Sequence, residues 1–234
     1  MIIREGMNHL DEEGVIKFSC DHSNAELSGR EERDLAFRLM AWRELMFATG
    51  LVGQDPGRYG GAGYGNLSGR LAPFLAAAGA RSFVVSGTQT GGKERLVAED
   101  FCVIREYDTP RNRVVSTGPI LPSSESMTHG TIYDLSPDIR FVFHAHAPQI
   151  WNRAELLDIP MSDPTVPYGT PEMAREVLRL YEETGLPGRR ILAMGGHRDG
   201  IIAFGETAEE VGGALMGVQA RAAELVLLEA EGRV

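Results

Sequence analysis

Apolar side chains along the chain follow two spacings, one typical of strands and one typical of helices. Segments 82–87 and 140–147 are short and mostly apolar, which predicts buried strands. Segments 31–50 and 207–230 carry apolar residues at intervals of three and four, which predicts helices. Strands in pairs with helices on either side predict an α/β fold. The expected architecture is an α/β/α layered domain with a central mixed, largely antiparallel sheet.

Weaker patterns predict further strands and one long loop. Segment 14–20 alternates like a short strand, and strands at 101–107 and 113–118 flank a TPRN turn. Segment 189–205 is expected to form a strand, a tight turn and a second strand. Segment 57–70 is dense in glycine, which predicts a loop with unusual backbone angles.

Polar residues mark the ends of three predicted helices. Ser123 is expected to be the N-cap of a helix that contains Glu125 in its first turn. Thr170 is the expected N-cap of a second helix, which ends near Gly185. Thr207 precedes the C-terminal helix, and Glu210 stands three residues later, which predicts a capping box.

Bulk composition favours a single globular domain over residues 1–234. The chain is 43% hydrophobic, which allows one large core, and it contains no linker-like run or internal repeat. Its net charge of -10 comes without a Lys/Arg cluster, so nucleic acid and anionic membranes are not expected partners. If the substrate is an anion, local hydrogen-bond donors must overcome this negative charge.

Three features indicate a cytoplasmic protein. No stretch of about 18 apolar residues occurs, so no membrane span is expected. The acidic start at 1–14 lacks the character of a signal peptide. Cys20 and Cys102 are far apart, and we expect both to be buried, reduced thiols.

The most informative motif is His144-Ala145-His146. Residues i and i+2 of a strand point to the same face, so the two imidazoles project together while Ala145 faces the opposite side. Such a pair can provide two ligands for zinc or a similar ion. The alternative is a pair of solvent-facing histidines on an edge strand, which the apolar residues just before them argue against. His197, in a glycine-rich turn, is the third candidate ligand.

Glu125 is the fourth candidate at this site. A carboxylate in the first turn of a helix is favoured by the helix dipole and by free N–H groups, so its position alone is also explained by capping. His129 lies one turn further on and shares a face with Glu125. It could orient Glu125 or pack in the core, and we favour the core.

The ordered set of motifs resembles the class II aldolase/adducin family over residues 35 to 225. The motifs that carry the resemblance are GYGNLSGR (63–70), VVSGTQTG (84–91), LPSSES (121–126), HAH (144–146), VPYGTPEMA (166–174) and GGHRDGIIAFG (195–205). Each is weak alone, but their order and spacing are specific. The resemblance implies a mixed sheet between helix layers and a homotetramer.

Residue roles follow from this resemblance. It implies that His144, His146 and His197 bind zinc, or Mn²⁺, Co²⁺ or Fe²⁺, and that Glu125 is both a metal ligand and the catalytic acid/base. The residues that match phosphate-binding positions are Asn66, Ser86, Gly87, Thr88, Thr90, Ser123 and Ser124.

The implied activity is that of a metal-dependent lyase, most closely an aldehyde-lyase. It would cleave a C–C bond of a small hydroxy-carbonyl compound, such as a sugar phosphate, through a metal-stabilised enediolate. Two departures weaken the match to the classical aldolases. Arg198 and Asp199 follow His197 where the family has glycine, and the family's catalytic tyrosines have no counterpart. A decarboxylase or dehydratase on the same fold, and a non-catalytic adducin-like scaffold, therefore remain as alternatives.

Overall fold

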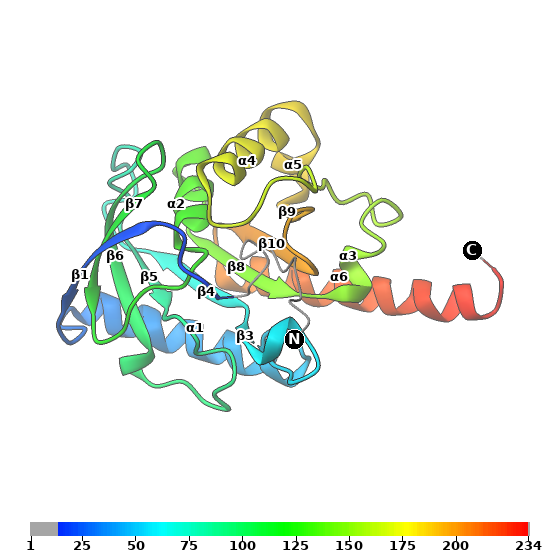
Figure 1. Cartoon of the computed structure of the whole chain (residues 1–234), viewed down its shortest axis with the longest axis horizontal. Coiled ribbons are helices and arrows are strands. Elements are labelled where there is room, and N and C mark those ends of the chain that lie inside the picture. The colour runs from blue at the N-terminus through cyan, green and yellow to red at the C-terminus, as the bar shows by residue number, and fades with distance from the viewer. Residues whose placement is uncertain (1–13, 234) are drawn as a thin grey trace, which may run out of the picture.

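A computed structural model describes residues 14–233 and is built around an eight-stranded sheet (Figure 1). In spatial order its strands are β1 (Ser19–Asn24), β7 (Arg113–Gly118), β6 (Phe101–Asp108), β5 (Phe83–Ser86), β4 (Asn66–Arg70), β8 (Phe141–His146), β10 (Gly200–Gly205) and β9 (Ile191–Ala193). A separate short ribbon pairs β2 (Gly53–Gln54) with β3 (Gly63–Tyr64). The helices are α1 (Arg30–Ala48), α2 (Ser126–Leu135), α3 (Pro148–Trp151), α4 (Pro171–Glu183), α5 (Leu186–Arg189) and α6 (Ala208–Ala230).

The sheet is mixed and largely antiparallel, as the sequence predicts. β1 pairs with β7 in parallel, and the other ladders between its described strands are antiparallel. Helices α1 and α6 cover one face, whereas α2 and α4 cover the other (Figure 1). The α/β/α layering of the sequence prediction is therefore confirmed.

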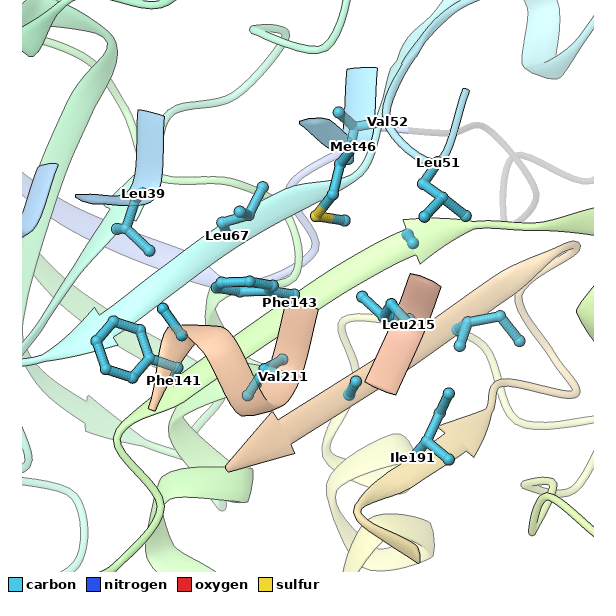
Figure 2. Packing of buried hydrophobic residues seen from close by; sticks show 14 of the residues in the cluster. Leu39, Met46, Leu51, Val52, Leu67, Phe141, Phe143, Ile191, Val211 and Leu215 are labelled. Carbon is cyan, nitrogen blue, oxygen red and sulfur yellow. The ribbon is translucent and has the colours of Figure 1, made fainter. Parts of the chain in front are cut away.

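Each face of the sheet carries its own hydrophobic cluster. The cluster under α1 and α6 includes Leu39, Phe143 and Leu215, which interlock between these helices and the sheet (Figure 2). The second cluster lies under α2 and α4 and includes Val142 and Ile202. Phe143 and Val142 are consecutive residues of β8, and successive side chains of a strand point to opposite faces, so β8 contributes to both clusters.

The prediction of a loop over 57–70 is correct for its first part and wrong for its last five residues. Gly60, Gly61 and Gly65 have positive φ angles, as a glycine-rich loop requires. Residues Asn66–Arg70 instead form β4, a fully buried strand between β5 and β8. Gly69 lies within this strand, and glycine fits there because a Cβ would lie 2.7 Å from the Leu35 side chain. Its glycine therefore reflects a close approach between layers and not a turn.

The predicted start of the helix at Ser123 is also wrong. α2 begins at Ser126, and Glu125 occupies the N-cap position without a side-chain cap hydrogen bond. The hydroxyl of Ser123 accepts a hydrogen bond from the Glu125 amide at 3.4 Å, so it caps a turn that precedes the helix. The predicted strand at 14–20 likewise lies too early, because β1 begins at Ser19.

The predicted caps of the two later helices fit the structure more closely. Thr170 accepts a hydrogen bond from the Met173 amide, and Thr207 accepts one from the Glu210 amide. The carboxylate of Glu210 does not complete the capping box, because it binds the amide of Glu206 instead.

Three predictions concern location and compartment. The predicted absence of a signal peptide concerns residues 1–14, nearly all of which lie outside the described residues. Against the sequence expectation, α6 is long and apolar enough to cross a membrane, although this is weak evidence. Its first half packs on the sheet through Val211 and Leu215. Cys20 and Cys102 are both free thiols, and Cys20 is only half-buried.

Two glycines of α6 give a matched test of this packing. A Cβ on Gly212 would lie 2.1 Å from the ring of Trp42, whereas one on Gly213 would meet nothing within 4 Å. We expect Gly212→Ala to lower the free energy of unfolding by about 1–3 kcal/mol through overpacking. Gly213→Ala should raise it by up to about 1 kcal/mol through helix propensity. Urea unfolding of both variants checks this, and equal effects would contradict the packing of α6 on α1.

Candidate metal centre

The centre of the site is β8, which lies inside the sheet between β4 and β10. His144 and His146 point to one face of this strand and are fully buried, while Ala145 enters the hydrophobic cluster on the other face. The edge-strand alternative for the two histidines is therefore excluded.

His197 joins them because the turn between β9 and β10 returns to β8. Gly200, three residues after His197, pairs with His146 in the antiparallel ladder. The ring centroid of His197 lies 5.0 Å from that of His144 and 4.7 Å from that of His146. Although Arg198 and Asp199 lengthen this turn, they do not move His197 away from the other two histidines.

The three imidazoles form a compact set of nitrogen donors. One ligand atom from each lies within 4.8 Å of the others, and the Nε2 atoms of His144 and His146 are 3.1 Å apart. His144 Nδ1 is 3.2 Å from the carbonyl oxygen of Ile201. If Nδ1 donates this hydrogen bond, Nε2 keeps its lone pair, which is the arrangement of a metal-binding histidine.

Electrostatics keep His144 and His146 neutral. Burial is the largest cause that lowers the pKa values of His144 and His146 well below the usual range, and the neighbouring His197 lowers both further. A neutral imidazole is the form that binds a metal ion. His144 and His146 therefore need no rise in pH to present their lone pairs to a metal ion.

Glu125 lies directly beside the histidine cluster. Its Oε1 is 3.4 Å from His197 Nδ1, and both side chains are buried. Glu125 is the N-cap residue of α2, where the helix dipole favours negative charge. Three imidazoles and one carboxylate are a donor set that suits a divalent ion and leaves room for another ligand.

His129 belongs to the core beneath the site. Its Nδ1 lies 2.7 Å from the hydroxyl of Ser68, which is also 2.7 Å from the hydroxyl of Tyr133. Burial lowers the pKa of His129 to about 3. These contacts agree with the core interpretation of His129.

A small hollow beside the cluster contains most of the predicted phosphate-binding residues. Those that line it are Asn66, Gly87, Thr88, Thr90, Ser123 and Ser124. Ser86 does not line the hollow. Its hydroxyl instead accepts a hydrogen bond from the amide of Leu67 in β4. Asn66 is the strand partner of His144, so the hollow directly adjoins the histidines.

The loop after β5 is only partly available to a ligand. The amides of Gly87 and Thr88 donate to the carbonyls of Asp100 and Leu121. From α1, the buried guanidinium of Arg43 holds the other side of the loop through the carbonyls of Gly91 (2.7 Å) and Glu94 (2.9 Å). Sequence reasoning did not identify Arg43, since a buried arginine on a helix has no local signal.

Two basic residues near these motifs, Arg70 and Lys93, do not line the hollow. Arg70 is buried at the far end of β4 and binds the carbonyl of Phe74 at 2.6 Å. Lys93 is paired with Asp100.

Three aromatic residues that the sequence did not single out as site residues contact the histidines. Tyr168 stacks on His197 with ring centroids 4.3 Å apart, and Lys17 Nζ lies 3.5 Å above the Tyr168 ring. Tyr59 and Tyr64 contact His146, at 4.6 and 5.4 Å between ring centroids. No local sequence pattern reports such contacts, because each ring lies far in sequence from the histidine that it contacts.

Comparison with known families and structures gives a consistent result. A sequence model of the class II aldolase and adducin N-terminal domain matches residues 57–226. No curated protein is similar enough in sequence to match the chain.

Solved structures share the fold at low sequence identity. L-fuculose 1-phosphate aldolase is 21% identical, with a TM-score of 0.62 over 85% of this chain and 88% of its own. Sugar-phosphate aldolase from Thermotoga maritima is 16% identical, with a TM-score of 0.63 over 86% and 97%. YgbL from Klebsiella pneumoniae, assigned provisionally as an aldolase, epimerase or decarboxylase, is 15% identical, with a TM-score of 0.60 over 86% and 92%.

The buried His129 generates a prediction for the pH dependence of stability. Below pH 6.5 the unfolded chain protonates this histidine, whereas the folded chain does so only near pH 3. Stability must therefore fall as pH falls from 6.5, by about 1.4 kcal/mol per pH unit for this group. His129→Gln should flatten the curve by that slope in urea unfolding between pH 7 and 5. Parallel curves for the metal-free wild type and variant would contradict the burial of a neutral His129.

Proposed function

Because the chain belongs to the family of class II aldolases and adducins, we propose that it is a divalent-metal-dependent lyase. It would cleave a C–C bond of a small hydroxy-carbonyl substrate. His144, His146 and His197 would hold the metal, and Glu125 would act as the acid/base.

One observation carries this proposal, namely the buried histidine cluster with a carboxylate in contact. Enzymes of this class use a divalent metal, and the three ligand atoms within 4.8 Å of one another fit one ion. Three imidazoles favour zinc, and manganese, cobalt or iron would also fit. The same four residues argue against a non-catalytic scaffold, which would not need to bury them together.

The protein's own groups have complementary tasks in this chemistry. When bound, the metal supplies a Lewis acid that stabilises negative charge developing on a substrate oxygen. The Glu125 carboxylate, shielded from solvent and 3.4 Å from His197, is placed to take or return a proton at the substrate carbon or oxygen next to it. The buried β8 face excludes bulk water, which strengthens these interactions.

The hollow beside the histidines supports a polar or phosphorylated substrate. Asn66, which pairs with His144 in the sheet, lines it together with Ser123 and Ser124. They can provide hydrogen bonds to an anion despite the negative net charge. The named sugar-phosphate aldolases with this fold make a sugar phosphate the first substrate class to test.

A decarboxylase or dehydratase is the second candidate, and one observation favours it. The amides of Gly87 and Thr88 already donate to backbone carbonyls, so this part of the loop offers fewer donors to a phosphate than the family resemblance implies. A lyase that acts on an unphosphorylated substrate would not need those donors.

We also propose a homo-oligomer, a tetramer by family resemblance, located in the cytoplasm. The single domain over residues 1–234 stays a prediction. Size-exclusion chromatography with light scattering tests the assembly directly.

Binding of an enediolate mimic separates the two candidate functions. We expect phosphoglycolohydroxamate to bind with micromolar or tighter affinity only when zinc is present. The double variant Ser123→Ala/Ser124→Ala should weaken this binding by roughly 30-fold, since two lost hydrogen bonds at about 1 kcal/mol each amount to about 2 kcal/mol. Calorimetric titration with and without zinc measures both. Zinc binding without binding of the mimic would favour the unphosphorylated substrate, and absence of both would favour a scaffold.

Replacing the acid/base tests the role of Glu125. Glu125→Gln keeps the size of the side chain but cannot exchange a proton, so we expect zinc to remain bound while turnover falls by about 10²–10⁴-fold. Cleavage of a panel of ketose 1-phosphates, including L-fuculose 1-phosphate, gives the rate, and elemental analysis gives the zinc content. Glu224→Gln, on the exposed side of α6, is the matched control. Normal turnover by Glu125→Gln would refute the role.

A further inference from the structure

The turn after His197 contains a residue with an unusual combination of properties. Asp199 is buried, although it is charged, and its φ angle is 65°. Glycine adopts a left-handed conformation without strain, whereas aspartate adopts it at some cost, although more readily than most residues. Aspartate at this position provides a carboxylate that glycine would lack.

That contribution is a bond to a loop 140 residues away in sequence. The hydroxyl of Tyr59 donates a hydrogen bond of 2.6 Å to Asp199 Oδ2. Arg58 lies 3.5 Å from the same oxygen and also donates to the Tyr59 hydroxyl. Arg198 lies further away, at 3.9 Å, and its side chain is largely exposed.

Tyr59 is strained in the same way as its partner. Six described non-glycine residues have a positive φ angle, and two of them, Tyr59 (50°) and Asp199 (65°), are bonded to each other. Each strained residue thus stabilises the other. The interaction joins the loop at 57–65 to the turn between β9 and β10.

This interaction is built around the metal-binding histidines. The Tyr59 ring stands edge-on to the His146 ring, at 74° and 4.6 Å between centroids. Tyr64, from the same loop, contacts His146 from another side. On the partner side, the carbonyl of Asp199 accepts a hydrogen bond of 2.8 Å from the amide of Ala147, the residue after His146.

We propose that Arg58, Tyr59 and Asp199 form a latch that positions His146 and the His197 turn for metal binding. These are positioning residues and not ligands, because the Asp199 carboxylate is engaged by Tyr59 and Arg58. The inference rests on the proposed function, since it assigns the latch to the metal centre described there. It also gives a role to Asp199, one of the two residues by which this turn departs from the family pattern.

Cobalt binding tests the latch without the need for a substrate. Tyr59→Phe keeps the ring against His146 and removes only the hydroxyl, with its bonds to Asp199 and Arg58. We expect it to raise the Co²⁺ dissociation constant by about 10- to 100-fold, as is typical for groups that orient metal ligands. The visible absorption spectrum of bound Co²⁺ should change as well, because the ligand geometry is less well defined.

Two further variants control for stability. Asp199→Gly removes the latch and also relieves the left-handed strain, so it should fold at least as well as the wild type yet lose Co²⁺ affinity to a similar extent. Tyr181→Phe, on α4 away from the site, should leave affinity and spectrum unchanged. The melting temperature of each metal-free protein shows whether a loss of affinity reflects unfolding.

The outcomes separate the latch from the metal centre itself. Wild-type affinity and spectrum in both Tyr59→Phe and Asp199→Gly would overturn the latch while leaving the metal centre intact. Failure of the wild type to bind Co²⁺ or zinc would overturn the metal centre, and the latch with it. Loss of affinity in both variants, with unchanged melting temperatures, would support the latch.

Discussion

The antiparallel register of β8 between β4 and β10 is the constraint on which the site depends. It pairs Asn66 with His144 on one side and Gly200 with His146 on the other. A slip of one residue would turn both histidines to the opposite face of the sheet. Phe143 and Ala145 prevent this, because they are fully buried in the cluster under α1 and α6. Apolar packing on one face therefore determines where the chemistry lies on the other.

Burial on that face has electrostatic consequences. It lowers the pKa values of His144 and His146, so their nitrogens are neutral and available to a cation. It also makes an isolated carboxylate costly, which the position of Glu125 at the start of α2 and beside His197 offsets. The histidines and the glutamate are thus mutually dependent, and a divalent ion would complete the balance of charge.

The loops around this rigid centre are held by a few long-range contacts. Arg43 of α1 binds carbonyls of the loop after β5, and Tyr59 binds Asp199 across 140 residues of sequence. Glycine in the loops permits their backbone angles but does not choose one conformation. Buried polar contacts of this kind select that conformation, and they shape the space that a substrate would occupy beside the histidines.

The sequence by itself determined the features that depend on local periodicity. The two-residue spacing of His144 and His146, the caps Thr170 and Thr207, and the layered α/β fold all follow from it. Local patterns failed at β4 and at the start of α2, where close packing against Leu35 and a turn before Ser126 override local preference. Only the tertiary structure brings His197 into contact with His144 and His146, and only the tertiary structure forms the bond between Tyr59 and Asp199. Such contacts join residues far apart in sequence, so no local pattern encodes them, and they exist only once the sheet register brings their loops together.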